Sequence, residues 1–124
     1  MKIMIVDDHA DMRRLLRRIV SGTPEGTNEI IECFDGDEAV EQFSFHNPDV
    51  VLMDIQLKTM NGFDAAEKIL HDEPNAKIFF VTSYDTPEFR ARAAVVKAKG
   101  FISKKNLSEL NHIIQTTLPK GGTL

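Results

Sequence analysis

The sequence predicts one α/β domain in which a parallel β-sheet is covered by helices on both faces. Short apolar runs alternate with amphipathic segments along the whole 124-residue chain, which is the pattern of repeated strand and helix units. The runs 50–54 and 77–82 are almost continuously apolar, as in central strands that are buried on both sides. A chain of this length builds a single hydrophobic core, so we expect one domain.

The individual elements follow from hydrophobic spacing and from turn residues. The predicted strands are residues 2–6, 29–34, 50–54, 77–82 and 100–103. The predicted helices are residues 10–21, about 35–45, 63–71, 86 to about 97 and about 106–118. The first helix is expected to bury one apolar face, formed by Met12, Leu15, Leu16, Ile19 and Val20. The Gly- and Pro-containing segment 22–26 ends that helix.

Three helix starts carry a capping signal. The residues concerned are Asp35 with Glu38, Thr86 with Pro87, and Asn106 with Glu109. A side-chain oxygen at the first of each pair accepts a hydrogen bond from the first turn of the helix, and proline suits the first helical position. We therefore expect these helices to begin at these residues.

Composition excludes several classes of protein. Apolar residues make up 42% of the chain and charged residues 27%, which is typical of globular domains. No apolar run approaches the roughly 20 residues of a membrane span, and no secretory signal is recognisable, so we expect a cytoplasmic protein without membrane contact. The net charge of −4 argues against direct nucleic-acid binding by this chain. The single cysteine, Cys33, is expected to be a buried small apolar residue.

Acidic residues stand where two of the predicted strands end. Asp7 and Asp8 follow the first strand, and Asp54 closes the third. If these strands are neighbours, three carboxylates converge at one edge of the sheet, where their mutual repulsion opposes folding. A cation relieves that repulsion, and carboxylate-lined sites suit hard divalent ions such as Mg²⁺. His9 has no second histidine beside it, so we interpret it as a loop residue.

The polar residues at the ends of successive strands resemble the receiver domain of two-component response regulators. They are Asp7 with Asp8, Asp54, Thr82 with Ser83, and Lys104. The resemblance covers residues 2 to about 118, which predicts a receiver domain over 1–118 and a tail or linker start over 119–124. It implies a doubly wound, flavodoxin-like sheet with strand order 2-1-3-4-5 and five helices, and ligand sites at the carboxyl ends of the strands where the winding reverses.

The resemblance also implies a role for each residue. Asp54 is the expected phosphoacceptor, served by a phosphohistidine on a sensor histidine kinase or a phosphotransfer protein. The expected Mg²⁺ ligands are Asp8, Asp54 and the Gln56 main-chain carbonyl, with Asp7 acting through a water. Lys104 and Thr82 are expected to contact the phosphoryl oxygens. The domain would catalyse its own phosphorylation and dephosphorylation without being a classical enzyme.

Output is expected through a switch. After phosphorylation, the Thr82 hydroxyl moves toward the phosphoryl group and vacates space for Phe101, which occupies the aromatic switch position of the family. Since phenylalanine has no hydroxyl to hold it outward, we expect it to favour the inward rotamer beforehand. The changed surface would be the fourth helix, fifth strand and fifth helix. It would contact a downstream effector domain or protein, and a phosphorylation-dependent homodimer stays open.

Two further features bear on partners and lifetime. Arginines 13, 14, 17 and 18 form a basic stripe on the first helix, and Arg14 and Arg18 are our candidates for the kinase-binding surface. A solvated helix face is the alternative. Tyr84 and Gln56 flank the site, and the bulk of Tyr84 is expected to slow self-dephosphorylation.

Three lysines depart from the family pattern. Lys58 and Lys105 stand where prolines are usual, and Lys97 stands where a glycine often ends the fourth helix. Without proline, a cis bond costs about 2.5 to 4 kcal/mol, so we expect the Lys104–Lys105 bond to be trans. Two other functions stay open. One is a haloacid-dehalogenase-like phosphatase, although such enzymes carry an acid where His9 stands, and the other is a receiver-like binding module without phosphoryl turnover.

Overall fold

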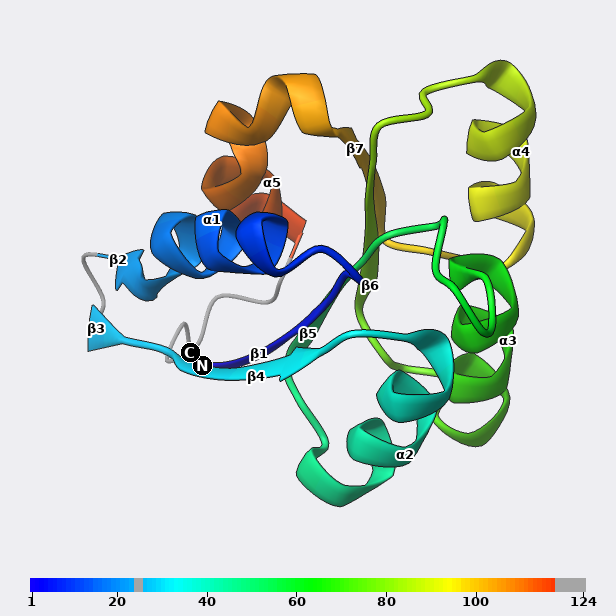
Figure 1. Cartoon of the computed structure of the whole chain (residues 1–124), viewed down its shortest axis with the longest axis horizontal. Helices are drawn as coiled ribbons and strands as arrows, with labels where there is room; N and C mark the ends of the chain where they lie inside the picture. The colour runs from blue at the N-terminus through cyan, green and yellow to red at the C-terminus, as the bar shows by residue number, and fades with distance from the viewer. Residues whose placement is uncertain (24–25, 118–124) are drawn as a thin grey trace.

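A computed structural model describes residues 1–23 and 26–117. Five parallel strands form one sheet in the order β4-β1-β5-β6-β7 (Figure 1). Their bounds are Lys2–Val6 for β1, Glu29–Cys33 for β4, Val50–Met53 for β5, Ile78–Thr82 for β6 and Gly100–Ser103 for β7. Numbered along the chain within this sheet, the order is 2-1-3-4-5, so the predicted fold class and topology are confirmed.

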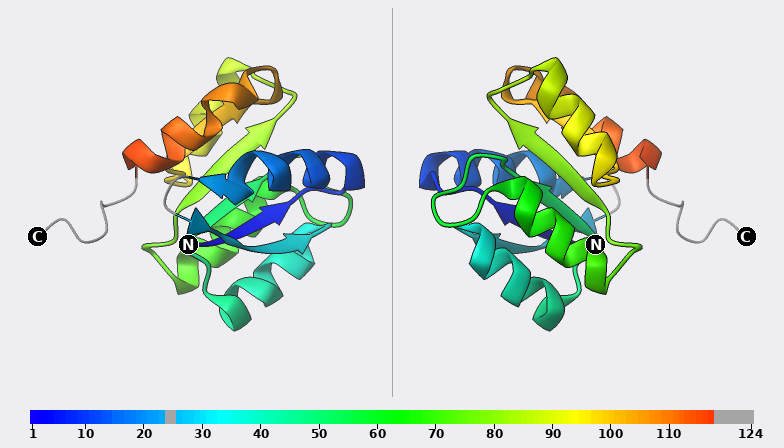
Figure 2. Two further views of the ribbon diagram at one scale, coloured as in Figure 1. Left: turned by 90° about the vertical axis from the view of Figure 1, so that its left-hand side faces the viewer. Right: turned by 90° about the vertical axis from the view of Figure 1, so that its right-hand side faces the viewer.

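Helices cover the sheet on both faces, as Figures 1 and 2 show. The five α-helices are α1 Ala10–Ser21, α2 Gly36–His46, α3 Gly62–Asp72, α4 Pro87–Val95 and α5 Leu110–Thr117. Helices α1 and α5 pack on one face, around Leu16, Ile5 and Phe79. Helices α2, α3 and α4 pack on the other, around Phe63 and Phe80. Among residues 1–23 and 26–117, no helix has the length and apolar character needed to cross a membrane.

The strands are as buried as their apolar composition predicts. The central strands β5 and β6 contain only buried residues, and β1 is buried beyond Lys2. Cys33 is fully buried at the end of β4, and this burial raises the pKa of its thiol to about 12. Alternate residues face opposite helix layers, so each strand contributes to both cores.

Three local expectations are wrong. Leu15 is exposed on the outer side of α1, and only the other four predicted apolar positions face the core. Helix α5 begins at Leu110, after a 3₁₀ segment over Lys104–Glu109. Ser103, rather than Asn106, provides the cap there, because its hydroxyl accepts a hydrogen bond from the Lys105 amide. Asn106 has non-helical backbone angles and kinks the segment.

The segment after α1 and the start of α2 were also compared with the expected helix ends. The segment after α1 contains two short antiparallel strands, β2 Gly22–Thr23 and β3 Gly26–Thr27, where the sequence indicates only a break. The capping signal of α2 is confirmed, because Asp35 accepts a hydrogen bond from the Glu38 amide at 2.8 Å. Leu118 and the predicted tail 119–124 lie outside the described residues.

Candidate functional site

The carboxyl ends of four parallel strands bring the predicted site residues to one edge of the sheet. Val6 of β1 pairs with Met53 of β5, so the residues that follow these strands, Asp7 and Asp54, are neighbours. The Asp54 amide donates to the Val6 carbonyl at 2.9 Å and extends this pairing by one residue. Strand register therefore decides which carboxylates meet.

Lys104 bridges the two buried carboxylates. Its Nζ donates to Oδ2 of Asp7 and to Oδ2 of Asp54, each at 2.9 Å. The Asp7 and Asp54 side chains are 1% and 6% exposed, and that of Lys104 is 11% exposed. The predicted convergence of Asp7, Asp54 and Lys104 is thus present, and Lys104 neutralises only part of the negative charge.

Burial sets the electrostatics of these groups. Burial raises the pKa of the Asp54 carboxyl above its ordinary 3.8; hydrogen bonding and charge from Lys104 only partly offset this, and Asp7 adds to it. Burial also opposes the charge on Lys104, but its bonds to Asp7 and Asp54 outweigh this and raise its pKa. Lys104 therefore stays charged, while the anion of Asp54 needs more positive charge than Lys104 supplies.

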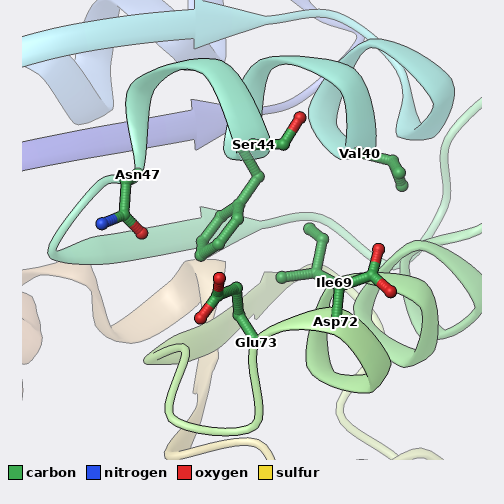
Figure 3. A pocket seen from close by; sticks show the side chains of 7 residues that line it. Val40, Ser44, Asn47, Ile69, Asp72 and Glu73 are labelled. Atoms are coloured by element: carbon green, nitrogen blue, oxygen red, sulfur yellow. The ribbon is translucent and has the colours of Figure 1, made fainter.

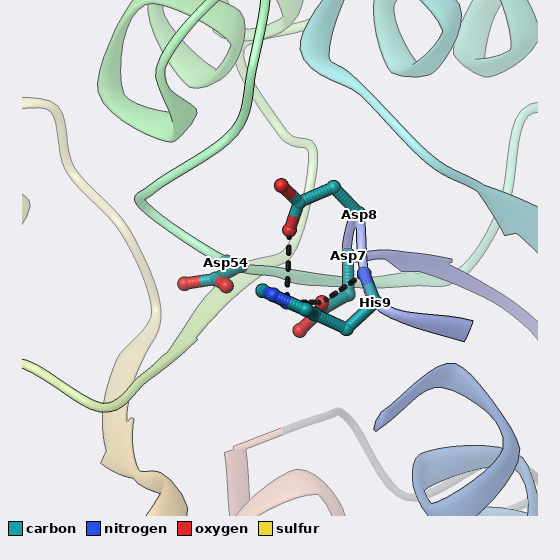
Figure 4. Close-up of side chains that lie close together, drawn as sticks. All are labelled: Asp7, Asp8, His9 and Asp54. Atoms are coloured by element: carbon teal, nitrogen blue, oxygen red, sulfur yellow. Dashed lines mark hydrogen bonds and ion pairs between the residues drawn. The ribbon is translucent and has the colours of Figure 1, made fainter. Parts of the chain in front are cut away.

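Asp8 and His9 complete the cluster. Asp7, Asp8, His9 and Asp54 each offer a ligand atom within 4.8 Å of the others (Figure 4). Oδ1 of Asp8 is buried and accepts no hydrogen bond. Nδ1 of His9 lies 3.0 Å from this oxygen and 3.2 Å from Oδ1 of Asp7. A buried carboxylate oxygen without a hydrogen bond, among three carboxylates, fits a divalent cation ligand.

The predicted loop interpretation of His9 is correct for its position but misses its contacts. Its side chain is 72% exposed, yet its ring nitrogen faces two of the site carboxylates. Its backbone amide also donates to Oδ1 of Asp7 at 2.9 Å. The loop interpretation rested on the lack of a second histidine nearby. The signal for the contact was the position of His9 directly after two strand-end acids.

Gly62 sets the position of the Asp54 backbone. A Cβ added at Gly62 would lie 2.8 Å from Cα of Ile55 and would collide with the Asp54 carbonyl oxygen. The Gly62 amide donates to the Ile55 carbonyl at 2.7 Å. The start of α3 therefore lies directly against the segment that carries Asp54, because residue 62 has no side chain.

Thr82 and Gln56 lie at or just beyond the carboxyl ends of two neighbouring strands, β6 and β5. Thr82 is fully buried at the end of β6, and its hydroxyl accepts a hydrogen bond from the Tyr84 amide at 3.1 Å. The exposed Gln56 donates its backbone amide to Oδ1 of Asp54 at 3.3 Å. Tyr84 is 50% exposed, and its ring lies edge-on to Phe89.

Comparison with known proteins agrees with this geometry. The family model of the response regulator receiver domain matches residues 3–115. The chain belongs to that family. A chemotaxis protein CheY from Thermotoga maritima is 39% identical over 83% of this chain and 84% of its own length. An oxygen regulatory protein NreC from Staphylococcus haemolyticus is 34% identical over 99% of this chain, which spans only 57% of NreC.

Solved structures show the same arrangement of the receiver domain. CheY in a CheX-CheY-BeF3-Mg+2 complex from Borrelia burgdorferi has a TM-score of 0.87 at 27% identity, covering 96% of this chain and 90% of that one. The response regulator TrrA from Thermotoga maritima, in complex with Mg(2+)-BeF, has a TM-score of 0.82 at 30% identity, covering 94% and 98%. As a receiver domain, this chain has a phosphorylation-accepting role in two-component signalling.

Phe101 of the receiver domain is half-buried against the core that contains α3 and α4. It is therefore not fully exposed, which is the arrangement that would have contradicted the expected inward rotamer. The Arg90 guanidinium lies 4.8 Å above its ring centre. Arg90 is itself held by Asp85 through two hydrogen bonds, at 2.6 and 2.9 Å. No pattern of spacing in the sequence indicates this stacking.

The basic stripe of α1 divides into two pairs. Arg13 and Arg17 each donate to Glu32 of β4, at 3.2 and 2.9 Å, so the neighbouring strand offsets their repulsion. Arg14 and Arg18 are exposed, and Arg14 pairs with Asp11 at 2.8 Å. The two arginines expected to face a partner are therefore those that lie on the outer side of the helix.

The structure describes the backbone at two of the lysines that depart from the family pattern, Lys97 and Lys105. Lys97 adopts the left-handed conformation, with φ of 65°, and ends α4 with paired hydrogen bonds. Its amide donates to Ala94, and the Ala98 amide donates to Ala93, which is a Schellman motif. Helix α4 thus ends at Val95, two residues before the predicted end. The Lys104–Lys105 bond is trans, as predicted.

A groove of about 270 Å³ lies between α2 and α3 (Figure 3). Its walls come from Val40 and Phe43 of α2, Ile69 and Asp72 of α3, and the residues that follow each helix. The carboxyl-terminal ends of helices in this fold lie at the opposite edge of the sheet from the carboxyl ends of the strands. The groove therefore takes no part in the chemistry of the strand-end site.

Proposed function

We propose that this receiver domain accepts a phosphoryl group on Asp54 from a phosphohistidine of a sensor kinase or a phosphotransfer protein. The observation that supports this most directly is the buried Asp54 carboxylate, bonded to Lys104 at 2.9 Å beside Asp7 and Asp8. In the transfer, an Asp54 oxygen forms a bond to phosphorus while the bond from phosphorus to the donor imidazole nitrogen breaks. The electron pair of that bond stays on the imidazole.

Charge neutralisation explains the residue types around Asp54. An anionic nucleophile approaching a phosphoryl group meets negative oxygens, and catalysis of such transfers is largely positioning and charge compensation. Lys104 already contacts Asp54, which supports a role in contacting a phosphoryl oxygen bonded to that residue. A bound Mg²⁺ would add positive charge between the carboxylates and the phosphoryl group.

The residues proposed to hold Mg²⁺ are Asp8, Asp54 and the Gln56 carbonyl, with Asp7 acting through a water. Oδ1 of Asp8 is the strongest support, because it is buried without a hydrogen bond. The CheY and TrrA structures are complexes with Mg²⁺ and a beryllium fluoride, which supports the same cation here. Hydrolysis returns Asp54 to a carboxylate when water attacks phosphorus and the bond from phosphorus to Asp54 breaks.

The signal is proposed to leave through Thr82 and Phe101. Thr82 lies one strand away from Asp54, and its hydroxyl accepts a hydrogen bond from the Tyr84 amide at 3.1 Å. A phosphoryl oxygen on Asp54 would be a charged acceptor for the proton of the Thr82 hydroxyl. Moving toward it would open space for Phe101 and alter the face formed by α4, β7 and α5. The protein that reads this face is a downstream effector.

The proposal is tested by incubating the protein with acetyl phosphate and Mg²⁺ and measuring its intact mass. We expect a labile gain of one phosphoryl group that Asp54→Asn abolishes. Asp37→Asn, which changes an exposed acid in the first turn of α2, should keep the gain. An adduct that survives in Asp54→Asn would contradict the assignment, and turnover of a phosphate ester without any adduct on Asp54 would favour a phosphatase. No adduct in the wild type would favour a binding module.

The outer arginines of α1 are proposed to contact the kinase. Replacing Arg14 and Arg18 with Glu reverses charge on an exposed surface away from the helix's inner contacts with Glu32. We expect slower transfer from the phosphorylated kinase and unchanged phosphorylation by acetyl phosphate. The matched control is Lys68→Glu with Lys99→Glu, two exposed lysines elsewhere on the surface. Equal loss in both assays would show that the stripe is only structural.

A further inference from the structure

We propose that His9 is an additional ligand of the cation site, which makes the site a mixed nitrogen and oxygen site that favours divalent transition-metal ions over Mg²⁺. This inference rests on the proposed function, because it takes the cluster of Asp7, Asp8 and Asp54 to be a divalent-cation site. It adds a ligand and a metal preference that carboxylates alone do not provide.

The spacing of the ligand atoms fits adjacent positions around one metal ion. Nδ1 of His9 lies 3.0 Å from Oδ1 of Asp8 and 3.2 Å from Oδ1 of Asp7 (Figure 4). Two ligands that bind one octahedral ion at roughly 2.1 Å, at right angles to each other, are themselves about 3 Å apart. The imidazole nitrogen and the Asp8 oxygen therefore have the separation of neighbouring ligands.

Lys104 leaves this side of the cluster open. Its two hydrogen bonds go to the Oδ2 atoms of Asp7 and Asp54. The oxygens that face His9 are the Oδ1 atoms of Asp7 and Asp8. A cation beside the Oδ1 atoms thus does not have to displace Lys104 from its partners.

The second observation is the unsatisfied oxygen of Asp8. Its Oδ1 is buried and accepts no hydrogen bond, although Nδ1 of His9 is only 3.0 Å away. The His9 ring is held beside Asp8 by a hydrogen bond between its Nδ1 and Oδ1 of Asp7, at 3.2 Å, and the His9 backbone amide donates to the same Asp7 oxygen. Nδ1 of His9 and Oδ1 of Asp8 therefore lie 3.0 Å apart, and a metal ion that takes the place of the Nδ1 proton would contact both atoms.

The chemistry of the donors decides which ions gain from His9. Mg²⁺ is a hard ion that binds oxygen and keeps several waters, so an imidazole adds little to its affinity. Imidazole suits Zn²⁺, Ni²⁺, Cu²⁺ and iron, and affinity at a nitrogen-containing site generally rises from Mn²⁺ through Ni²⁺. The site should therefore discriminate against Mg²⁺ through His9 alone.

The first test asks directly whether a nitrogen atom binds the metal. Pulsed electron paramagnetic resonance of the wild-type protein with MnCl₂ is expected to show modulation from a directly bound imidazole nitrogen. The modulation should disappear in His9→Ala and persist in His71→Ala, an exposed histidine at the distal end of α3. Absence of the modulation in the wild type, with Mn²⁺ bound, would overturn the proposal.

The second test measures selectivity by calorimetry with NiCl₂ and MgCl₂ separately. Loss of a second-shell partner alone typically lowers metal affinity about 10–100-fold, so loss of a direct ligand should lower Ni²⁺ affinity at least about tenfold. We expect that loss in His9→Ala and in His9→Gln, with Mg²⁺ affinity changed much less. An equal fall for both ions would overturn a role for His9 in selectivity.

The two tests also separate this inference from the proposed function. His9 is largely exposed, so both variants should fold, which circular dichroism checks. If Mg²⁺ binds and Asp54 is phosphorylated while His9→Ala changes nothing, the inference about His9 fails and the proposed function stands. If the wild type binds no divalent ion, both fail together.

Discussion

The acidic cluster and the α4–β7 region are two parts of one sheet edge that are held in different ways. Around Asp54, charged groups are buried and share close hydrogen bonds, with Lys104 bridging two carboxylates. Around Phe101, the contacts lie at the surface: Arg90 and its partner Asp85 are both exposed. Val95, the last residue of α4, is 76% exposed, and Lys97, two residues later, has a left-handed backbone conformation. Buried charges are thus concentrated around Asp54, whereas the region around Phe101 is held by exposed contacts.

The largest expected effect breaks the buried side of this comparison. Lys104→Ala leaves the Asp7 and Asp54 carboxylates buried without their cation, and such a loss typically costs about 3 kcal/mol of unfolding free energy. We expect urea unfolding at neutral pH, without divalent ions, to show this loss. Addition of Mg²⁺ should recover part of it. If Lys104→Ala were as stable as the wild type, the two carboxylates would have to relieve their repulsion by local rearrangement.

The next effect concerns the charge of Asp54 itself. A carboxyl whose pKa is raised by folding stabilises the folded state while it is protonated, and this contribution is lost as the pH rises through the raised pKa. At neutral pH the ionised Asp54 therefore costs stability. We expect Asp54→Asn to raise the unfolding free energy at neutral pH by about 1 to 2 kcal/mol, because it removes one buried charge while Lys104 keeps Asp7 as a partner. The gain should shrink as the pH falls toward the ordinary value of 3.8.

A pH series of urea unfolding, without metal, checks this sign. Asp37→Asn, an exposed carboxyl at the start of α2, should show no comparable gain. A gain that grows toward acid pH would show that Asp54 is stabilised as an anion, contrary to the raised pKa.

A smaller effect tests the backbone strain at Lys97, just after the end of α4. Lys97 has a positive φ of 65°, which a residue with a Cβ adopts at a cost of about 1 kcal/mol. Lys97→Gly should therefore raise the unfolding free energy by about that amount, because glycine adopts this conformation freely. Lys97→Ala keeps the Cβ and should give no gain. Equal gains in the two variants would locate the benefit in the lost lysine side chain.

The smallest effect on stability should come from Arg90. Its side chain stacks on Phe101 but is exposed, as is its partner Asp85, so Arg90→Ala should leave the urea midpoint unchanged. The ring signals of Phe101 in nuclear magnetic resonance should nevertheless move, because the cation above the ring is gone. Arg92→Ala, which removes a similar cation from Phe63, should leave Phe101 unaffected. Unchanged ring signals of Phe101 in Arg90→Ala would show that the stacking has no part in the proposed switch.

The elements that sequence reasoning placed correctly are those with strong local signals. Residues 2–6 and 100–103 are strands because short apolar runs end at polar residues, and the structure has the same bounds. The start of α5 was misplaced because Asn106 and Glu109 have cap spacing, whereas the Ser103 hydroxyl caps a 3₁₀ turn first. Competition between two nearby caps is decided by tertiary packing of the following helix, which spacing alone does not contain.

The site follows the same division. Asp7 and Asp54 were predicted to meet because parallel strands end at one edge, and the resemblance to receiver domains added Lys104 to them. The pairing of Arg13 and Arg17 with Glu32 was not predicted, since it depends on β4 lying beside α1. Contacts that follow from the order of strands are accessible to sequence reasoning, and contacts between side chains on different layers are not.

The close approach of Gly62 to residues 54 and 55 has a consequence for any survey of tolerated substitutions. Because even one added carbon atom there must push the Asp54 carbonyl aside, a replacement at residue 62 displaces Asp54, the proposed phosphoacceptor, without touching a charged group. In a saturation mutagenesis screen scored by signalling, this glycine should therefore group with the carboxylates, although its own side chain is a single hydrogen atom.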